Sequence, residues 1–345
     1  MRVLVFRMSS LGDLILSTSF LETLPSDVRV DWVVASDFEF VLRGHPKIKK
    51  LFVFQKKTGI LGWIRLLGEI SKVPYDVRVD LHKTPRTRIA SVLLYLNDIL
   101  RMRRTRRVSI SKERIKTLGV LVLKGLMPKP LQPTPYWIRF ARAASKVTGG
   151  SVNPKRPSYL SVLESSGLSE ELALQAFNLE SAQYFCLMPA SRWRTKEWGP
   201  ESFFELALAF SKRGLIPVLL GRDKDPACQR LKELLDASGV RFVSALQEPD
   251  FRISALLLKN ASFFVGCDTG LSHLSEAVGC RTHVVFGPTR PEIGFGPCQS
   301  ESKSISLPIG CAPCSKDGKH CYRIWSPYEC MKALRPEMVI KEILP

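Results

Sequence analysis

The feature that most constrains the fold is a repeated alternation of short apolar runs with segments of helical periodicity. The first hundred residues contain four such pairs, in which an apolar run is followed by apolar residues spaced three to four positions apart. We expect strands at residues 2–6, 28–34, 48–54 and 76–81, and helices at 14–24, 38–42, 61–70 and 86–96. This repeat is typical of a mostly parallel sheet that helices cover on both faces.

A second series of the same kind begins after residue 180. It predicts strands at 184–188, 215–220, 241–243, 262–265 and 282–286, and helices at 200–213, 226–237, 252–258, 271–278 and 335–343. Prolines and serines between 151 and 169 mark a linker, and residues 107–150, which four prolines interrupt, show less regularity. The 345 residues therefore predict two doubly wound α/β domains, 1–160 and 161–325, and a helical tail, 326–345.

One polar turn stands at the end of the first predicted strand. It reads Arg7-Met8-Ser9-Ser10-Leu11-Gly12-Asp13, and it places Asp13 at the start of a helix. Ligands of open α/β sheets bind beside the carboxyl ends of the strands. Asp13 is therefore a candidate functional carboxylate.

Three turns of the second series carry polar residues at the corresponding edge. The turn at 189–198 contains Ser191 and Lys196, the next contains Asp223, and the stretch Asp268-Thr269-Gly270 opens a helix that includes His273. Hydroxyls, a lysine and a helix N-terminus can together neutralise a diphosphate, and Asp223 suits the hydroxyls of a ribose. Neither G-x-x-x-x-G-K-[ST] nor G-x-G-x-x-G occurs in the chain.

Structural explanations exist for the same residues. His273 could be a core histidine, Lys196 could be exposed, and Trp193 and Trp198 could serve packing alone. Asp225 precedes a proline, which favours a helix N-cap over a metal-binding D-x-D pair. The position of these turns after successive strands is what favours a shared site.

The net charge of +19 is concentrated in one segment. Residues 76–142 hold 16 lysines and arginines against four acidic residues, a surplus of twelve positive charges. An anionic partner or a solvated basic face would explain it. No apolar run approaches the roughly 18 residues of a membrane span, and the N-terminus lacks the pattern of a secretion signal, so we expect a cytoplasmic protein.

Four of the nine cysteines lie close together near the C-terminus. Cys311, Cys314, Cys321 and Cys330 follow the spacing C-x2-C-x6-C-x8-C. The first pair has the spacing of a zinc half-site, whereas the second pair is wider than usual. The pattern leaves open a structural zinc or free, partly buried thiols.

Several of these stretches together resemble a known family. The turn from Arg7 to Asp13, the Lys196-x-Trp198 turn, the segment 268–273 and the segment 286–289 look like those of the ADP-heptose:lipopolysaccharide heptosyltransferases, glycosyltransferase family 9. The resemblance implies a GT-B fold, with two Rossmann-like domains facing across a cleft. It also implies that the C-terminal domain holds the sugar nucleotide and the N-terminal domain holds the acceptor.

The resemblance further implies roles for individual residues. Asp13 would be the general base of an inverting transfer that needs no metal or other cofactor, and Lys196 would stabilise the departing diphosphate. The nucleotide sugar would be bound by Ser191, Asp223, Asp268, Thr269, Gly270 and His273. The acceptor would be bound by Arg7, Ser10, His82 and Arg86, in a half that follows the family pattern only loosely.

The expected partners follow from this resemblance and from the charge. They are an ADP-sugar donor, an anionic lipopolysaccharide core or other anionic glycolipid, and the inner surface of the cytoplasmic membrane. A family 9 enzyme with another donor or acceptor is the main alternative. A more remote alternative is a non-enzymatic nucleic-acid-binding protein that stacks bases on Trp193 and Trp198. Since no nucleic-acid-binding motif is visible, we expect no nucleic acid partner.

Overall fold

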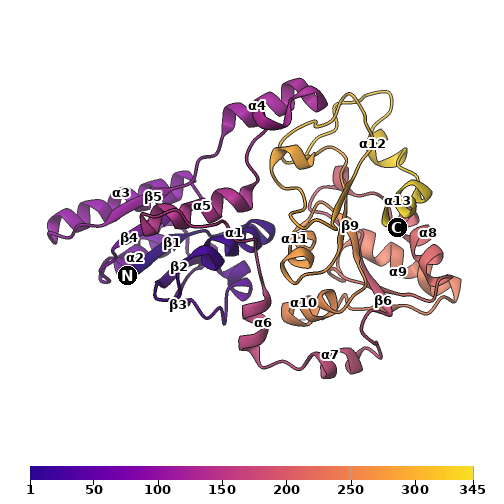
Figure 1. Cartoon of the computed structure of the whole chain (residues 1–345), viewed down its shortest axis with the longest axis horizontal. Helices are drawn as coiled ribbons and strands as arrows, with labels where there is room; N and C mark the ends of the chain where they lie inside the picture. The colour runs from indigo at the N-terminus through magenta and orange to yellow at the C-terminus, as the bar shows by residue number, and fades with distance from the viewer. Residues whose placement is uncertain (249, 345) are drawn as a thin grey trace. The chain divides into compact units, whose positions relative to one another are not determined.

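The computed structural model describes residues 1–248 and 250–344, and its contacts divide the chain into two compact units. Unit 1 comprises Met1–Lys112 and Tyr136–Gly167, and unit 2 comprises Glu113–Pro135 and Leu168–Pro345. Figure 1 shows the helices and strands of both units along the chain. Each unit is built from two separate segments of the chain. The chain therefore passes from one unit to the other three times, after residues 112, 135 and 167.

Unit 1 contains a five-stranded parallel sheet. Its strands lie in the order β3-β2-β1-β4-β5, and each hydrogen-bonded pair is parallel. The strands are β1 (Arg2–Phe6), β2 (Arg29–Ala35), β3 (Ile48–Phe54), β4 (Val77–Asp80) and β5 (Arg106–Ser109). Val3, Leu4 and Val5 of the central strand are fully buried. A parallel strand covered on both faces requires such a continuous apolar run.

Helices cover both faces of this sheet. On one face α1 (Leu11–Thr23) packs against α5 (Tyr136–Thr148), and Phe20 of α1 meets the ring of Trp32 edge-on at 6.5 Å. On the other face α2 (Gly59–Ser71) and α3 (Pro85–Leu100) pack over the alternate strand residues. The side chains of that core include Leu4, Phe6, Val33, Phe52, Phe54, Trp63, Leu66, Ala90 and Leu94.

Unit 2 contains a six-stranded parallel sheet in the order β11-β10-β9-β6-β7-β8. The strands are β6 (Tyr184–Met188), β7 (Ile216–Leu219), β8 (Val243–Ser244), β9 (Phe264–Cys267), β10 (Thr282–Val285) and β11 (Lys303–Ile305). The main helices are α8 (Pro200–Ser211), α9 (Pro226–Ser238), α10 (Phe251–Lys259), α11 (Gly270–Ala277) and α13 (Pro336–Ile343). The predicted α/β fold with two parallel sheets is confirmed.

Several elements differ from the sequence-based expectation. The region 107–150 is more regular than expected, because its prolines are confined to the connection between α4 (Arg114–Leu123) and α5. The expected helix at 38–42 is a 3-10 helix, η1 (Ser36–Val41). The remaining short helices are α6 (Leu160–Ser166), α7 (Glu170–Ala176), α12 (Glu329–Lys332), η2 (Lys56–Thr58), η3 (Lys124–Leu126), η4 (Lys129–Leu131), η5 (Arg194–Lys196) and η6 (Pro291–Ile293).

Among the described residues, no helix combines the length and the apolar character that crossing a membrane would require.

Candidate active site

A half-buried ion pair lies at the carboxyl edge of the unit 2 sheet. Lys196, in the η5 turn after β6, places its Nζ 2.6 Å from Oδ2 of Asp268, which directly follows β9. Thr289, in the turn after β10, donates its hydroxyl to the same carboxylate oxygen at 2.8 Å. Three turns from three neighbouring strands therefore meet on one carboxylate, as the strand order predicts.

The α11 helix begins beside this ion pair. Thr269 is its N-cap residue, with an extended backbone, and Gly270 is its first residue. The Thr269 hydroxyl makes no capping bond and is buried without a hydrogen-bond partner among the described residues. The first N–H groups of a helix have no partner within the helix, and their positive partial charge attracts anions. Together they offer an anion a set of donors that the protein itself leaves unused.

The other residues predicted for nucleotide binding have more local contacts. His273 is buried in α11, and its ring lies 6.4 Å from that of Phe295. The backbone N–H of Ser191 donates to Oε1 of Glu197 at 3.1 Å, and burial raises the pKa of that glutamate. Asp223 is exposed after β7, where its carboxylate accepts from the side-chain amide of Gln229.

The structure decides some of the alternative interpretations. Trp198 serves packing, because it is buried and donates its Nε1 hydrogen to the carbonyl of Leu334 at 2.6 Å. The centre of the Trp193 ring lies 5.1 Å from the guanidinium of Arg192 and 5.3 Å from the ammonium of Lys319. Asp225 is the N-cap residue of α9 as predicted, but its side chain makes no capping bond and pairs instead with Arg222.

Sequence reasoning missed a loop that packs on Lys196. The Thr195 hydroxyl donates to the carbonyl oxygen of Gly318, a residue with φ of +69°. A Cβ atom at Gly318 would lie 3.1 Å from Cε of Lys196 and 3.0 Å from Cγ2 of Thr289. The segment around Gly318 therefore fixes the position of both side chains that contact Asp268. In the sequence Gly318 indicates only a turn. No sequence pattern connects it to Lys196, which lies 122 residues earlier.

Gly318 lies within the cysteine-rich segment, residues 311–330. The geometry of this segment does not support a zinc site. Within residues 1–248 and 250–344, no three His, Cys, Asp or Glu side chains are placed to hold a metal ion, and the nine cysteines are free. Burial, reinforced by the neighbouring cysteines, raises the pKa of Cys330 to about 11 and also raises that of Cys314. The spacing of Cys311, Cys314, Cys321 and Cys330 left open a structural zinc or free thiols, and their geometry does not support the zinc.

In unit 1, Asp13 is held by two neighbours in the turn after β1. Its Oδ1 atom lies 2.6 Å from a guanidinium nitrogen of Arg7, and its Oδ2 atom accepts from the Ser10 hydroxyl at 2.9 Å. Arg7 is itself buried and donates to the carbonyl oxygen of Leu81 at 2.8 Å. Asp13 keeps a fifth of its side chain exposed, 21%, whereas Arg7 is enclosed. Arg7 and Ser10 therefore orient Asp13.

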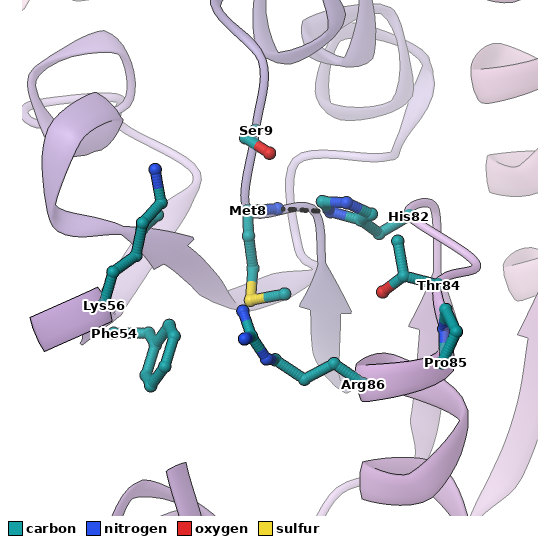
Figure 2. Close-up of a pocket in the computed structure, with 9 residues that line it drawn as sticks. Met8, Ser9, Phe54, Lys56, His82, Thr84, Pro85 and Arg86 are labelled. Carbon is teal, nitrogen blue, oxygen red and sulfur yellow. Dashed lines mark hydrogen bonds between the residues drawn. The ribbon is translucent and has the colours of Figure 1, made fainter. Parts of the chain in front are cut away.

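A pocket of about 310 Å³ lies at the carboxyl edge of the unit 1 sheet. Its lining follows the ends of β1, β2, β3 and β4 and consists of Met8, Ser9, Ala35, Phe54, Lys56, His82, Thr84, Pro85 and Arg86. Figure 2 shows Lys56, His82 and Arg86 around it. The sequence predicted His82 and Arg86 but missed Lys56, although Lys56 follows a strand in the same way.

The pocket is lined by basic side chains. The turn after β4, which carries His82, is held by Asp80 at the end of that strand. Asp80 accepts hydrogen bonds from the backbone of His82 at 2.9 Å and from the Thr87 hydroxyl at 2.8 Å. Lys56 pairs with Asp37 at 2.6 Å, and Arg86 lies 4.9 Å from the centre of the Phe54 ring. Two cations therefore line a pocket that suits an anionic group.

His82 contributes a neutral donor to this pocket. Burial, assisted by the charge of Arg7, lowers the pKa of His82 to about 4, so the ring is neutral at pH 7. Its Nδ1 atom accepts the Met8 N–H at 3.0 Å (Figure 2), which leaves the ring proton on Nε2. The Nε2 hydrogen of His82 is therefore an uncharged hydrogen-bond donor beside the cations Lys56 and Arg86.

Solved structures with the same architecture define the class of fold. The chain aligns with E. coli heptosyltransferase WaaC with ADP over 99% of each chain, at 19% identity and a TM-score of 0.72. It aligns with the glycosyl transferase family 9 protein from Veillonella parvula over 99% of this chain and 95% of that one, at 18% identity and a TM-score of 0.73. The protein therefore has the GT-B fold of the heptosyltransferase structures.

The sequence comparisons identify the family. The model of "Glycosyltransferase family 9 (heptosyltransferase)" matches residues 107–323. A lipopolysaccharide heptosyltransferase 1 of Pseudomonas aeruginosa is 26% identical over 341 residues, which cover 92% of this chain and 86% of that protein. The chain belongs to glycosyltransferase family 9 and is a transferase. The remote expectation of a non-enzymatic nucleic-acid-binding protein is therefore wrong.

Proposed function

We propose that the protein transfers a heptose, or a related sugar, from an ADP-sugar to an anionic lipopolysaccharide core. The observation that carries the donor half of this proposal is the Lys196–Asp268–Thr289 cluster beside the unused Thr269 hydroxyl at the start of α11. The relatives support the choice of substrate class, since one is named lipopolysaccharide heptosyltransferase 1 and WaaC was solved with ADP-2-deoxy-2-fluoro heptose. The other family 9 donors and acceptors are the alternative.

The donor is bound by residues 161–325 in this proposal, and residues 326–345 form a tail. Lys196 stabilises the negative charge that grows on the diphosphate as the sugar departs. It is assisted by the hydroxyls of Ser191 and Thr269 and by the backbone N–H of Gly270. Asp268 orients Lys196 through their 2.6 Å contact. Asp223, Asp268 and His273 hold the nucleoside.

The acceptor is bound by residues 1–160 in this proposal. Asp13 takes the proton of an acceptor hydroxyl while that oxygen attacks the anomeric carbon, and the diphosphate leaves with the electron pair of the broken bond. A single displacement inverts the anomeric centre and requires no metal. Arg7 and Ser10 keep the carboxylate in place.

The basic pocket binds an anionic group of the same acceptor. Lys56, Arg86 and the neutral His82 suit a phosphate or carboxylate. Since such an acceptor is carried on a lipid, we place the enzyme at the inner face of the cytoplasmic membrane.

The donor is tested by thermal shift with free and sugar-linked nucleotides. A ligand that binds only the folded protein stabilises it by mass action, so ADP and ADP-heptose should raise the melting temperature. UDP- and GDP-linked sugars at the same concentration should leave it unchanged. The reverse pattern would overturn the donor and retain the GT-B fold.

The catalytic step is tested by Asp13→Asn. Loss of the base should lower the transfer rate by about 10²- to 10⁴-fold, while the shift produced by ADP stays at its wild-type size. Asp27→Asn, an exposed aspartate of the same unit, is the matched control and should transfer at the wild-type rate. An Asp13→Asn enzyme of normal activity would remove Asp13 as the base.

A further inference from the structure

The solvent side of α3 is apolar. Ile89, Val92, Leu93, Leu96, Ile99 and Leu100 are each at least 45% exposed, and we call these six residues the α3 apolar face. Their spacing of three and four positions places them along one side of the helix. The exposed side of an ordinary surface helix is polar.

The buried side of α3 is the more polar one. Thr87, Ala90, Leu94 and Asp98 face the unit 1 core, and Asp98 forms a buried ion pair with Arg78 of β4. Ala90 and Leu94 belong to the core under the sheet. The helix is therefore already fixed to unit 1 by its other side, and the α3 apolar face has no role in that core.

Cations border the α3 apolar face. The stretch from Arg86 to Arg107 contains seven arginines and a single acidic residue, the buried Asp98. Five of the arginines follow the helix directly, and Met102 among them is 93% exposed. Arg107 lies 4.3 Å from the ring centre of Tyr95, a residue of α3 that is itself 42% exposed.

An anionic lipid bilayer matches both features. Its hydrocarbon accepts the apolar side chains of a helix that lies in the plane of the interface, and its headgroups attract the arginines. A protein partner would need an apolar groove edged by acidic residues. A second copy of this chain would bring its own arginines against these, which costs free energy.

We propose that the α3 apolar face and the arginines after it dock the enzyme on an anionic membrane surface. The inference rests on the proposed function only for the need to reach a lipid-linked acceptor. It adds the element that makes the contact: α3 lies in the headgroup region and does not span the membrane.

The proposal is tested by sedimentation of the full chain with vesicles of phosphatidylcholine alone or mixed with phosphatidylglycerol. Wild type should sediment with the anionic vesicles and be released by salt. Leu96→Asp/Leu100→Asp should remove the apolar contact, and Arg101→Glu/Arg104→Glu should weaken binding at least about tenfold, since each basic residue near such a surface contributes appreciably.

Matched controls are available in unit 2. Leu172→Asp/Ile324→Asp replaces two exposed apolar residues away from α3. Lys212→Glu/Lys341→Glu reverses the charge of two exposed lysines that lie away from the arginines after α3. Both should bind the vesicles like wild type. All variants should keep the melting-temperature shift with ADP, and this readout separates membrane docking from the proposed function.

Three results would overturn the proposal. In the first, the wild-type protein does not bind anionic vesicles at low salt. In the second, Leu96→Asp/Leu100→Asp and Arg101→Glu/Arg104→Glu bind the vesicles as well as wild type does. In the third, light scattering shows a wild-type dimer that Leu96→Asp/Leu100→Asp dissociates, and the wild type does not bind vesicles. The last would make the face a contact between copies.

Discussion

At the scale of single residues, Gly318 connects the cysteine-rich segment, residues 311–330, to the proposed donor site. We expect Gly318→Ala to weaken ADP binding severalfold, because its Cβ would press on Lys196 at 3.1 Å and on Thr289 at 3.0 Å. Its φ of +69° is unfavourable for alanine by about 1 kcal/mol. ADP titrations followed by calorimetry, together with melting temperatures, measure both effects.

Gly310→Ala is the control for this substitution. Gly310 lies in the same part of the chain, but a Cβ there would meet nothing within 4 Å. Its ADP affinity should equal that of wild type. Equal loss in the two variants would mean that Gly318 has no specific contact with the donor site.

Residue positions were predictable where they follow the ends of strands. Lys196 and Asp268 were expected together because the turns after parallel strands share one edge, and the structure places them 2.6 Å apart. Contacts made from a distant loop, such as that of Gly318, leave no local pattern in the sequence. The Asp225 side chain shows a related limit, since a nearby arginine competes for it with the helix N-terminus.

At the scale of elements, Asp98 fixes α3 to β4. Its side chain and that of Arg78 are 5% and 6% exposed, and burial lowers the pKa of Arg78 although Asp98 opposes this. We expect Asp98→Ala to lower the free energy of unfolding by about 3–5 kcal/mol, because the arginine is left buried without its partner. Urea unfolding followed by circular dichroism measures the change.

The double variant Arg78→Met/Asp98→Leu separates charge from packing. It removes both charges and keeps the apolar volume, so it should be more stable than Asp98→Ala. If the two variants were equally destabilised, the buried ion pair would not be the cause.

Strands with apolar runs were predictable, and strands without them were not. All strands of the two sheets were expected except β5 and β11, whose sequences are Arg-Arg-Val-Ser and Lys-Ser-Ile. Both are edge strands, where a charged or polar sequence is common because only one neighbour covers them. Hydrophobic patterns do not detect such strands.

At the scale of the whole molecule, acid should weaken the fold through a histidine in each unit. Burial lowers the pKa of His82 to about 4 and that of His283 to about 3, and both cations near His283 act in the same direction. Between about pH 6.5 and pH 4 the unfolded chain then binds protons that the folded chain does not. The free energy of unfolding should therefore fall as the pH falls through that range.

His283→Leu tests this pH dependence. The two ring nitrogens of His283 are buried without a hydrogen-bond partner in the described structure, so leucine removes a titrating group and no hydrogen bond of the ring. The difference in melting temperature between pH 7.5 and pH 5 should be smaller in the variant. An unchanged difference would show that His283 does not contribute.

The class of fold was predictable at this scale, because the βα repeat extends along both halves of the chain. The concentration of positive charge in residues 76–142 was equally visible. The surface that accompanies this charge was not predictable. Only the structure shows that α3 turns its apolar side to solvent and buries Asp98.

The three passages of the chain between the units also limit how such enzymes can be recombined. Glu113–Pro135 belongs with unit 2, although unit 1 resumes at Tyr136 and continues to Gly167. A single crossover between two family genes therefore cannot exchange one whole unit for its homologue. Joining unit 1 of one enzyme to unit 2 of another requires three junctions, near residues 112, 135 and 167.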